Sequence, residues 1–296
     1  MPESDDKQPR IKSADRVLDV FEALTHEQHG LTFPELVSRL GVPKSSLHGL
    51  LAVLVERQYL VFDEGSRRYV FGVQLFEHGQ SFLRQHGDSR EARLAMEAVV
   101  AEVNETVQLG LLRGSEGVNI GTVDCTHALR LRLEVGRHFP GYATSLGKVL
   151  LAQLPEDEMI ERARKEPLYR HTEHTLATVE ELIAELRRIR ERGFSLDTEE
   201  MIPGVFCIGV PIFDSSGQAR TGMSVTIPTS RLNLDTGSRA LAALARESIG
   251  VSSRMGVAAA SPALSQLASQ GSAAAALMNT RAKSWLGAQD HVPARR

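Results

Sequence analysis

Polar residues on either side of Leu47 have the types and the spacing of a nucleic-acid contact. Lys44, Ser45, Ser46 and His48 lie in one predicted helix whose opposite face is rich in leucine. Lysine and serine side chains can reach DNA phosphates, and serine and histidine can reach base edges in the major groove. A polar helix face is more often simply solvated, so this interpretation depends on the elements around it.

Three short helices are predicted between residues 13 and 54, because apolar residues recur there at the spacing of one buried helical face. Ser13 is placed to cap the first helix. Thr32 and Glu35 form a capping box for the second helix, which Gly41 ends, and Pro43 begins the third. The apolar positions are Val17, Val20, Phe21, Leu24, Leu36, Val37, Leu40, Leu47, Leu50, Leu51 and Leu54.

A hairpin is predicted after the third helix. Residues 59–62 and 67–71 have strand-like sequences, and an acidic turn with a glycine at 63–66 separates them. Three helices followed by a hairpin make a winged helix-turn-helix, in which basic residues at the wing tip contact phosphates. Basic residues before the first helix could form an arm beside the wing. The basic residues assigned to DNA are therefore Arg10, Lys12, Arg67 and Arg68.

The charge of this region limits how tightly one copy could bind DNA. Residues 1–86 hold 10 Lys and Arg against 12 Asp and Glu, a net charge of −2. Because strong DNA affinity needs several phosphate contacts, we expect a homodimer, or a dimer of dimers, that places copies of the domain on half-sites of double-stranded operator DNA. A linking helix is predicted over residues 73–87. Its apolar residues, which suit subunit pairing, are Val73, Phe76, Phe82 and Leu83.

The composition of the whole chain excludes several classes of protein. Its 296 residues, 42% hydrophobic and 24% charged, are typical of two globular domains. No apolar run approaches the roughly 18 residues that would suggest a membrane span, and the acidic N-terminus lacks the apolar core of a secretory signal. Cys125 and Cys207 form no CxxC motif. We therefore expect a cytoplasmic protein without a membrane segment, a disulfide framework or a cysteine-based zinc cluster.

Residues 88–255 carry mixed strand and helix patterns. Leucine alternating with charged residues over 129–135 predicts a half-buried strand, and a capping box at Thr178 begins a helix that Gly193 ends. Two hairpins are predicted as well. They join residues 106–113 to 118–123 and residues 205–213 to 219–227. This combination indicates an α+β domain with an antiparallel sheet and flanking helices.

Three segments of the chain, in one consistent order, resemble a known family. IKSADRVLDVFEAL, continued by GLTFPELVSRLGVPKSSLHGLLAVLVERQYLVFDEGSRRYVFGVQLFEHG, is similar to the N-terminal domain of the IclR family of bacterial transcription regulators. LEVGRHFPGYATSLGKVLLAQLPEDE resembles the segment that leads into the ligand domain of that family. GFSLDTEEMIPGVFCIGVPIFDSSGQARTGMSVTIP resembles its most specific motif. The resemblance covers about residues 10–250. It implies a DNA-binding regulator with a GAF-like effector domain. We expect a repressor rather than an activator, and the sequence leaves both open.

One residue of the predicted recognition helix departs from the family pattern. Family members often have arginine where this chain has Gly49. A glycine inside a helix costs about 0.5–1 kcal/mol relative to alanine, and here it also removes a DNA contact. Lys44, Ser46 and His48 would then carry more of the base recognition.

The resemblance also implies a small-molecule site, a cup between the sheet and the loop before Gly147. The lining residues are assigned at the positions of this sequence that match the effector site of the family. The polar lining is Ser145, Asp197, Cys207, Ser224 and Thr226, with Leu146 beside Ser145, and the apolar wall is Leu131, Phe139 and Val205.

The residue types of this implied site suit a small organic acid with hydroxyl or carbonyl groups. Backbone amides before a helix predicted at 148–153 favour a carboxylate, and Ser224 and Thr226, two apart on a strand, face the same side. Asp197 would repel an anion unless it is protonated or accepts a hydrogen bond from an effector hydroxyl. Cys207, taken alone, is more often a small buried apolar residue.

Enzymatic and metal chemistry have weaker support. Cys207 lacks the sequence context of a nucleophile, and His171 and His174 lack a further ligand motif. The acidic residues Asp197, Glu199 and Glu200 are typical of a solvated loop. There is no P-loop and no GxGxxG motif, so no catalytic residue, metal or cofactor is assigned. A sensor whose winged helix contacts protein instead of DNA stays an alternative.

The sequence therefore predicts five zones. Residues 1–9 form a mobile arm, 10–72 the winged helix-turn-helix, 73–87 the linking helix, and 88–255 the GAF-like effector domain. Residues 256–296 hold 12 Ala and 5 Ser with few large apolar residues, which predicts a disordered low-complexity tail. The alternative for this tail is a short helix over 272–286 that docks through Leu277, Trp285 and Leu286.

Overall fold

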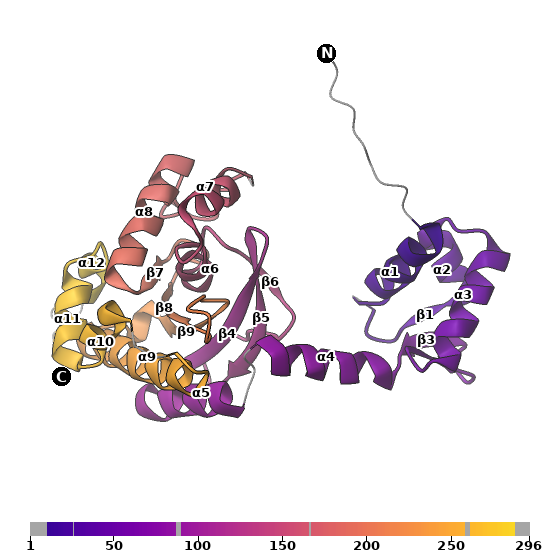
Figure 1. Cartoon of the computed structure of the whole chain (residues 1–296), viewed down its shortest axis with the longest axis horizontal. Coiled ribbons are helices and arrows are strands. Elements are labelled where there is room, and N and C mark those ends of the chain that lie inside the picture. The colour runs from indigo at the N-terminus through magenta and orange to yellow at the C-terminus, as the bar shows by residue number, and fades with distance from the viewer. Residues whose placement is uncertain (1–10, 26, 87–89, 166, 258–260, 288–296) are drawn as a thin grey trace, which may run out of the picture. The chain divides into compact units, whose positions relative to one another are not determined.

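A computed structural model describes residues 11–25, 27–86, 90–165, 167–257 and 261–287 (Figure 1). The chain divides between Phe82 and Leu83 into two compact units. This division falls inside α4 (Val73–His86), the helix predicted as the linker. The arm predicted at residues 1–9 lies outside the described residues, as does Arg10.

The N-terminal unit is the predicted winged helix-turn-helix. Its elements in chain order are α1 (Lys12–Thr25), β1 (Leu31–Thr32), α2 (Phe33–Leu40), α3 (Lys44–Glu56), β2 (Leu60–Asp63) and β3 (Arg68–Phe71). The hairpin of β2 and β3 forms as predicted, and β1, which the sequence did not reveal, pairs antiparallel with β3. Val20, Leu36, Leu47 and Leu51 are at most 1% exposed, so the predicted helical faces form one core.

The helix ends of this unit follow their capping residues. The backbone N–H of Thr32 donates to the Glu35 carboxylate at 2.7 Å, and the Thr32 hydroxyl accepts from the backbone N–H of Glu35, which completes the predicted capping box. Gly41 ends α2 in the left-handed conformation at φ +61°. The prediction for Ser13 is wrong, because α1 already begins at Lys12 and Ser13 lies inside its first turn.

The C-terminal unit contains an antiparallel sheet with helices on both faces. In the described residues six strands are ordered β6-β5-β4-β9-β8-β7. The strands are β4 (Thr106–Arg113), β5 (Glu116–Val123), β6 (His138–Pro140), β7 (Ser195–Thr198), β8 (Val205–Ile212) and β9 (Thr221–Pro228). The flanking helices are α5 (Arg90–Val103), α6 (Ser145–Leu151), α7 (Glu156–Lys165), α8 (Val179–Arg192) and α9 (Leu234–Arg254).

The two faces of this sheet have different partners. Apolar side chains such as Leu109, Ile208 and Val225 pack with α5 and α9 into the main core. Helix α6 covers the opposite face, and α7 and α8 pack around α6 in a second apolar cluster. Both predicted hairpins are present, and α8 runs from the predicted capping box at Thr178 to Gly193.

The strand predicted over residues 129–135 is wrong. This segment is irregular, and β6 occupies the sheet edge beside β5 instead. The Thr122 hydroxyl donates to the Leu133 carbonyl at 2.8 Å, and Asn119 Nδ2 donates to the carbonyl of Glu134 at 3.0 Å. Side chains therefore form hydrogen bonds with the backbone carbonyl groups that a strand would need for pairing with its neighbour.

The prediction of a disordered tail is wrong over residues 261–287. These residues form α10 (Pro262–Leu267), α11 (Gln270–Met278) and α12 (Lys283–Leu286). Helices α10 and α11 lie beside α9, and α12 packs on α11 (Figure 1). Alanine favours helix, and the few leucines are placed so that they reach the core. Gly237 of α9 lets Leu286 approach closely, because a Cβ atom there would lie 3.2 Å from its side chain. Residues 258–260 and 288–296 lie outside the described residues.

No helix in the described part of the chain combines the length and the apolar character needed to cross a bilayer.

Candidate functional site

Polar and small residues form two adjacent rows on the α6 face of the C-terminal sheet. In one row Asp197 of β7 pairs with Cys207 of β8, and Cys207 pairs with Thr226 of β9. In the next row on the same face, Gly209 of β8 pairs with Ser224 of β9. Residues two apart on a strand share a face, so the register brings four of the predicted polar residues together.

Gly209 lets the start of α6 approach the sheet closely. A Cβ atom at this position would lie 3.0 Å from the backbone carbon and oxygen of Ser145. The Ser195 hydroxyl donates to the Ser145 carbonyl at 2.5 Å, and Thr144 caps α6 by accepting from the backbone N–H of Gly147. Helix α6 therefore begins at Ser145, earlier than the helix predicted over residues 148–153.

A cavity of about 210 Å³ lies between this sheet face, the start of α6 and the irregular segment before β6. Every residue that the family resemblance implies for an effector site lines it. These residues are Leu131, Phe139, Ser145, Leu146, Asp197, Val205, Cys207, Ser224 and Thr226.

The cavity also has lining residues that were not predicted. Gln108 and Thr144 add polar groups, and Arg132, Arg137 and His138 bring cationic or hydrogen-bonding groups from an exposed segment. Arg132 and Arg137 add two positive charges to the predicted set, and Glu134 adds one negative charge. The remaining lining residues are Asn119, Leu133, Glu134, Met201 and Ile202.

Asp197 is the buried acid of this cavity, with 3% of its surface exposed. Its Oδ1 accepts hydrogen bonds from the backbone N–H groups of Glu200 at 2.7 Å and Met201 at 3.4 Å. Burial, reinforced by the Glu200 carboxylate, raises the pKa of Asp197 to about 7. A protonated Asp197 can donate a hydrogen bond to a ligand oxygen, which removes the repulsion expected between this residue and an anion.

Cys207 forms part of the cavity wall, and its surroundings do not activate its thiol. Its sulfur lies 3.4 Å from the Thr226 hydroxyl oxygen. Burial and the neighbouring Asp197 both raise the pKa of the thiol. Nucleophilic cysteines need a lowered pKa, so this environment disfavours catalysis.

A buried ion pair lies behind the cavity wall. Lys148 Nζ of α6 donates to both carboxylate oxygens of Glu200 at 2.5 Å, and neither side chain is exposed. Removing one partner of a buried pair leaves an uncompensated charge, so such pairs hold their elements together strongly. Here the pair joins α6 to the turn after β7, which carries the hydrogen-bond donors to Asp197.

The exposed face of α3 carries residues predicted to contact DNA. Lys44, Ser45 and His48 are exposed. Ser46 is half-buried, and its hydroxyl accepts a hydrogen bond from Arg16 Nη1 at 2.7 Å. Arg16 of α1 thus brings an unpredicted cation to the start of α3. Lys12, one turn before Arg16, is exposed.

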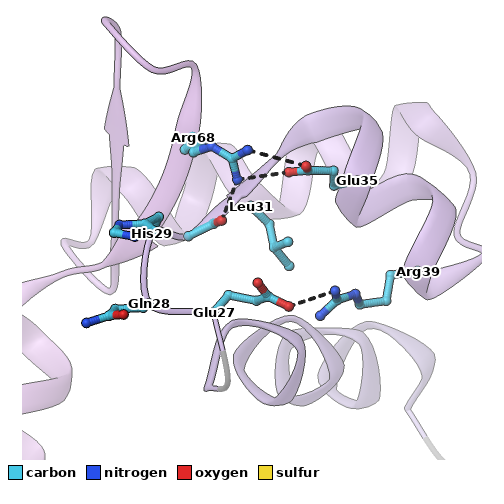
Figure 2. Close-up of a pocket in the computed structure, with 8 residues that line it drawn as sticks. Glu27, Gln28, His29, Leu31, Glu35, Arg39 and Arg68 are labelled. Carbon is cyan, nitrogen blue, oxygen red and sulfur yellow. Dashed lines mark hydrogen bonds and ion pairs between the residues drawn. The ribbon is translucent and has the colours of Figure 1, made fainter.

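The two wing arginines have different surroundings. Arg67 is exposed, with its guanidinium 5.3 Å from the ring centre of Phe62. Arg68 turns toward the body of the unit, where its Nη1 donates to the Gly30 carbonyl at 2.7 Å and to the Glu35 carboxylate at 3.1 Å (Figure 2). A phosphate contact by Arg68 would break these bonds, so the geometry favours Arg67.

A second ion pair lies near Arg68, in a surface hollow of the N-terminal unit lined by residues 27–31, Glu35, Arg39 and Arg68. Figure 2 shows Glu27 and Arg39 facing each other, with Arg39 Nη2 2.7 Å from the carboxylate. Arg39 and Arg68 each pair with a carboxylate, so their charges are already compensated. These contacts therefore favour a structural role for the hollow over the binding of an anion.

The two histidines of the sequence His171-Thr172-Glu173-His174 contact different partners. His171 Nε2 lies 2.9 Å from the Tyr142 hydroxyl, and the His174 ring meets Trp285 edge to face at 5.1 Å. Among the described residues no cluster of three or more candidate metal ligands occurs.

Comparison with known proteins matches both units. The model of the IclR helix-turn-helix domain matches residues 13–64, and the model of the bacterial transcriptional regulator IclR C-terminal domain matches residues 80–253. The chain belongs to the IclR family of bacterial transcriptional regulators. As an IclR-family regulator it combines a DNA-binding helix-turn-helix domain with an effector-binding C-terminal domain. Neither match extends past residue 253, so α10–α12 lie beyond them.

Individual IclR-family relatives cover most of the chain. KdgR of Dickeya chrysanthemi is 33% identical over 253 residues, which are 85% of this chain and 82% of KdgR. BhcR of Paracoccus denitrificans is 33% identical over 75% of this chain and 80% of BhcR. The structure of an IclR regulator from Alicyclobacillus acidocaldarius covers 84% of this chain and 100% of its own, with a TM-score of 0.72 and 26% identity. These relatives are named as transcriptional regulators, which supports a non-enzymatic role.

Proposed function

We propose that this IclR-family regulator represses transcription from operator DNA and that a small organic acid, bound in the 210 Å³ cavity, modulates its DNA binding. The observation that carries the proposal is the convergence of nine predicted lining residues, from separate strands, loops and α6, on one cavity. A concave site with apolar walls and a few placed polar groups is the usual form of a ligand pocket.

The chemistry of the cavity favours an acid with further oxygen atoms. Arg132 and Arg137 lie in the segment that borders it and complement a carboxylate. Ser224 and Thr226 offer hydroxyl groups on one face, and a protonated Asp197 offers a donor. A volume of about 210 Å³ is below the common range for drug-sized ligands, which supports a small effector.

The DNA-binding unit supports action as a homodimer or a dimer of dimers. Lys44, Ser45 and His48 offer one exposed recognition face, and a second copy would double the phosphate contacts of an acidic domain. Val73 and Phe76 of α4 are 51% and 66% exposed, as expected for residues that a second copy covers. The relative named transcriptional repressor IclR in Escherichia coli supports repression rather than activation. Binding to bacterial operator DNA would place the protein in the cytoplasm.

Calorimetric titration of the full-length protein tests the effector assignment. The ligands are hydroxy, keto and aromatic carboxylic acids, and the control ligands are alcohols of the same carbon skeletons. At least one acid should bind and its matching alcohol should not. Equal binding of acid and alcohol, or no binding by any acid, would contradict the assignment.

A further inference from the structure

The C-terminal helices contact the turn that closes one side of the cavity. This turn comprises Glu199, Glu200, Met201 and Ile202, the first four residues of the 199–204 connection between β7 and β8; we call it the 199–202 turn. Met201 and Ile202 line the cavity. The backbone N–H of Glu200 holds Asp197 at 2.7 Å, so the position of the turn also sets the position of the buried acid.

The outer side of the 199–202 turn is held by residues of the tail. Arg281, between α11 and α12, donates from Nη2 to the Glu200 carboxylate. Trp285 of α12 donates from its indole nitrogen to the Glu199 carboxylate at 3.3 Å. The turn therefore lies between the cavity on one side and the C-terminal helices on the other.

Glu200 has two cationic partners that come from different parts of the fold. Lys148 reaches it from α6, inside the region that the family models match, and Arg281 reaches it from beyond that region. The Glu200 side chain is 0% exposed, so each partner offsets the cost of burying its charge. Glu199 also has an unusual backbone, with φ +61° in a residue other than glycine, so its conformation depends on surrounding contacts.

We propose that α10–α12 form a strap that keeps the 199–202 turn closed on the cavity, with Arg281 as the positioning residue. The proposal rests on the proposed function in one respect, because the cavity is taken as the effector site. Leu264, Leu277 and Leu286 pack in the main core and fix the position of the strap. Arg281 then fixes the position of the 199–202 turn through its hydrogen bond to Glu200. Loss of Arg281 would lower the free energy of local opening while the anchoring helices stay in place.

The two cysteines allow a test without an effector. Cys207 lines the cavity, whereas Cys125 is buried elsewhere, 5% exposed, with its backbone N–H donating to the Thr106 hydroxyl. The full-length protein is treated with iodoacetamide, and the labelling rate of each cysteine is followed by peptide mass spectrometry. Local opening of the 199–202 turn accelerates labelling at Cys207 alone, and global unfolding accelerates labelling at both cysteines.

Arg281→Ala should raise the labelling rate of Cys207 by about tenfold and leave that of Cys125 unchanged, because a hydrogen bond to a buried charged group is lost. Removal of a positive charge would by itself disfavour the thiolate, so acceleration must come from access. Arg281→Lys should restore most of the protection. The matched control is Lys283→Ala, which removes an exposed cation from the same segment and should match the wild type.

An unchanged Cys207 rate in Arg281→Ala, or equal acceleration of both cysteines, would overturn the strap. These outcomes are independent of the effector, since no acid is present during labelling. A selective effect at Cys207 together with failure of every acid to bind would keep the strap and reject the effector assignment.

Discussion

The backbone N–H of Glu200 donates to Oδ1 of Asp197 at 2.7 Å, so the buried acid of the cavity is fixed by the turn that follows its strand. Burial and the Glu200 carboxylate raise the pKa of Asp197 to about 7, against the opposing influence of Lys148. The cavity thus holds an acid whose charge changes near neutral pH.

Binding of an anionic effector should weaken as the pH rises through this pKa. Below about pH 7 Asp197 is neutral and can donate a hydrogen bond, and above it the carboxylate repels the anion. Calorimetric titration of an acid between about pH 6 and about pH 8 measures this loss, which should approach tenfold per pH unit above the pKa. Asp197→Asn should flatten the profile. A wild-type profile as flat as that of the variant would show that Asp197 does not titrate in the site.

Ser224→Val should weaken binding of the acid by roughly tenfold and leave operator affinity unchanged. The variant removes a hydroxyl that lines the cavity, which loses about 0.5–1.5 kcal/mol of hydrogen bonding, and its additional methyl group narrows the cavity. The matched control is Thr221→Val on the same strand, which is also buried and does not line the cavity. Equal effects of the two variants would point to a general disturbance of β9.

Arg67→Gln should lower operator affinity and its dependence on salt. Each phosphate contact contributes about 0.9 to the slope of log K against log salt concentration, so the slope should fall by about that amount for each copy bound. Arg68→Gln is the comparison, because Arg68 is bound to Glu35 and the Gly30 carbonyl. It should lower the temperature of thermal unfolding by a few degrees and leave the salt slope intact. A lower salt slope in Arg68→Gln together with an unchanged slope in Arg67→Gln would show that Arg68, and not Arg67, contacts the phosphate.

Gly49→Ala should stabilise the protein by about 0.5–1 kcal/mol. Gly49 lies within α3, is exposed, and a Cβ atom there would have no neighbour within 4 Å. Urea unfolding of the full-length chain measures the gain. Destabilisation of the variant would contradict the interpretation of Gly49 as an unconstrained position of α3. A loss of operator affinity without a loss of stability would indicate close approach of DNA at this position.

The winged helix could be predicted from sequence because its determinants are local. The Thr32–Glu35 capping box, the left-handed Gly41 and the leucines of α3 each act within one or two helical turns. The lining of the cavity followed from the family resemblance, and the pairing of Cys207 with Asp197 and Thr226 explains why those residues converge.

The features that were missed depend on contacts between distant residues. Alternation over residues 129–135 resembles a strand, but Asn119 and Thr122 occupy the carbonyl groups of that segment, so Arg132 borders the cavity instead. The alanine-rich tail has few large side chains, and its order depends on the burial of Leu264, Leu277 and Leu286 in a core formed by distant parts of the chain. Nothing near Arg281 in the sequence indicates its partner Glu200, 81 residues away.

Fluorescence anisotropy of the full-length protein on its own upstream DNA, at two salt concentrations and with and without the acid that binds best, tests the central claim most directly. The account predicts specific, salt-sensitive binding whose affinity changes about 5- to 150-fold when the acid is present. Binding equal to that of a scrambled DNA, or operator affinity that is the same with and without the acid, would contradict it.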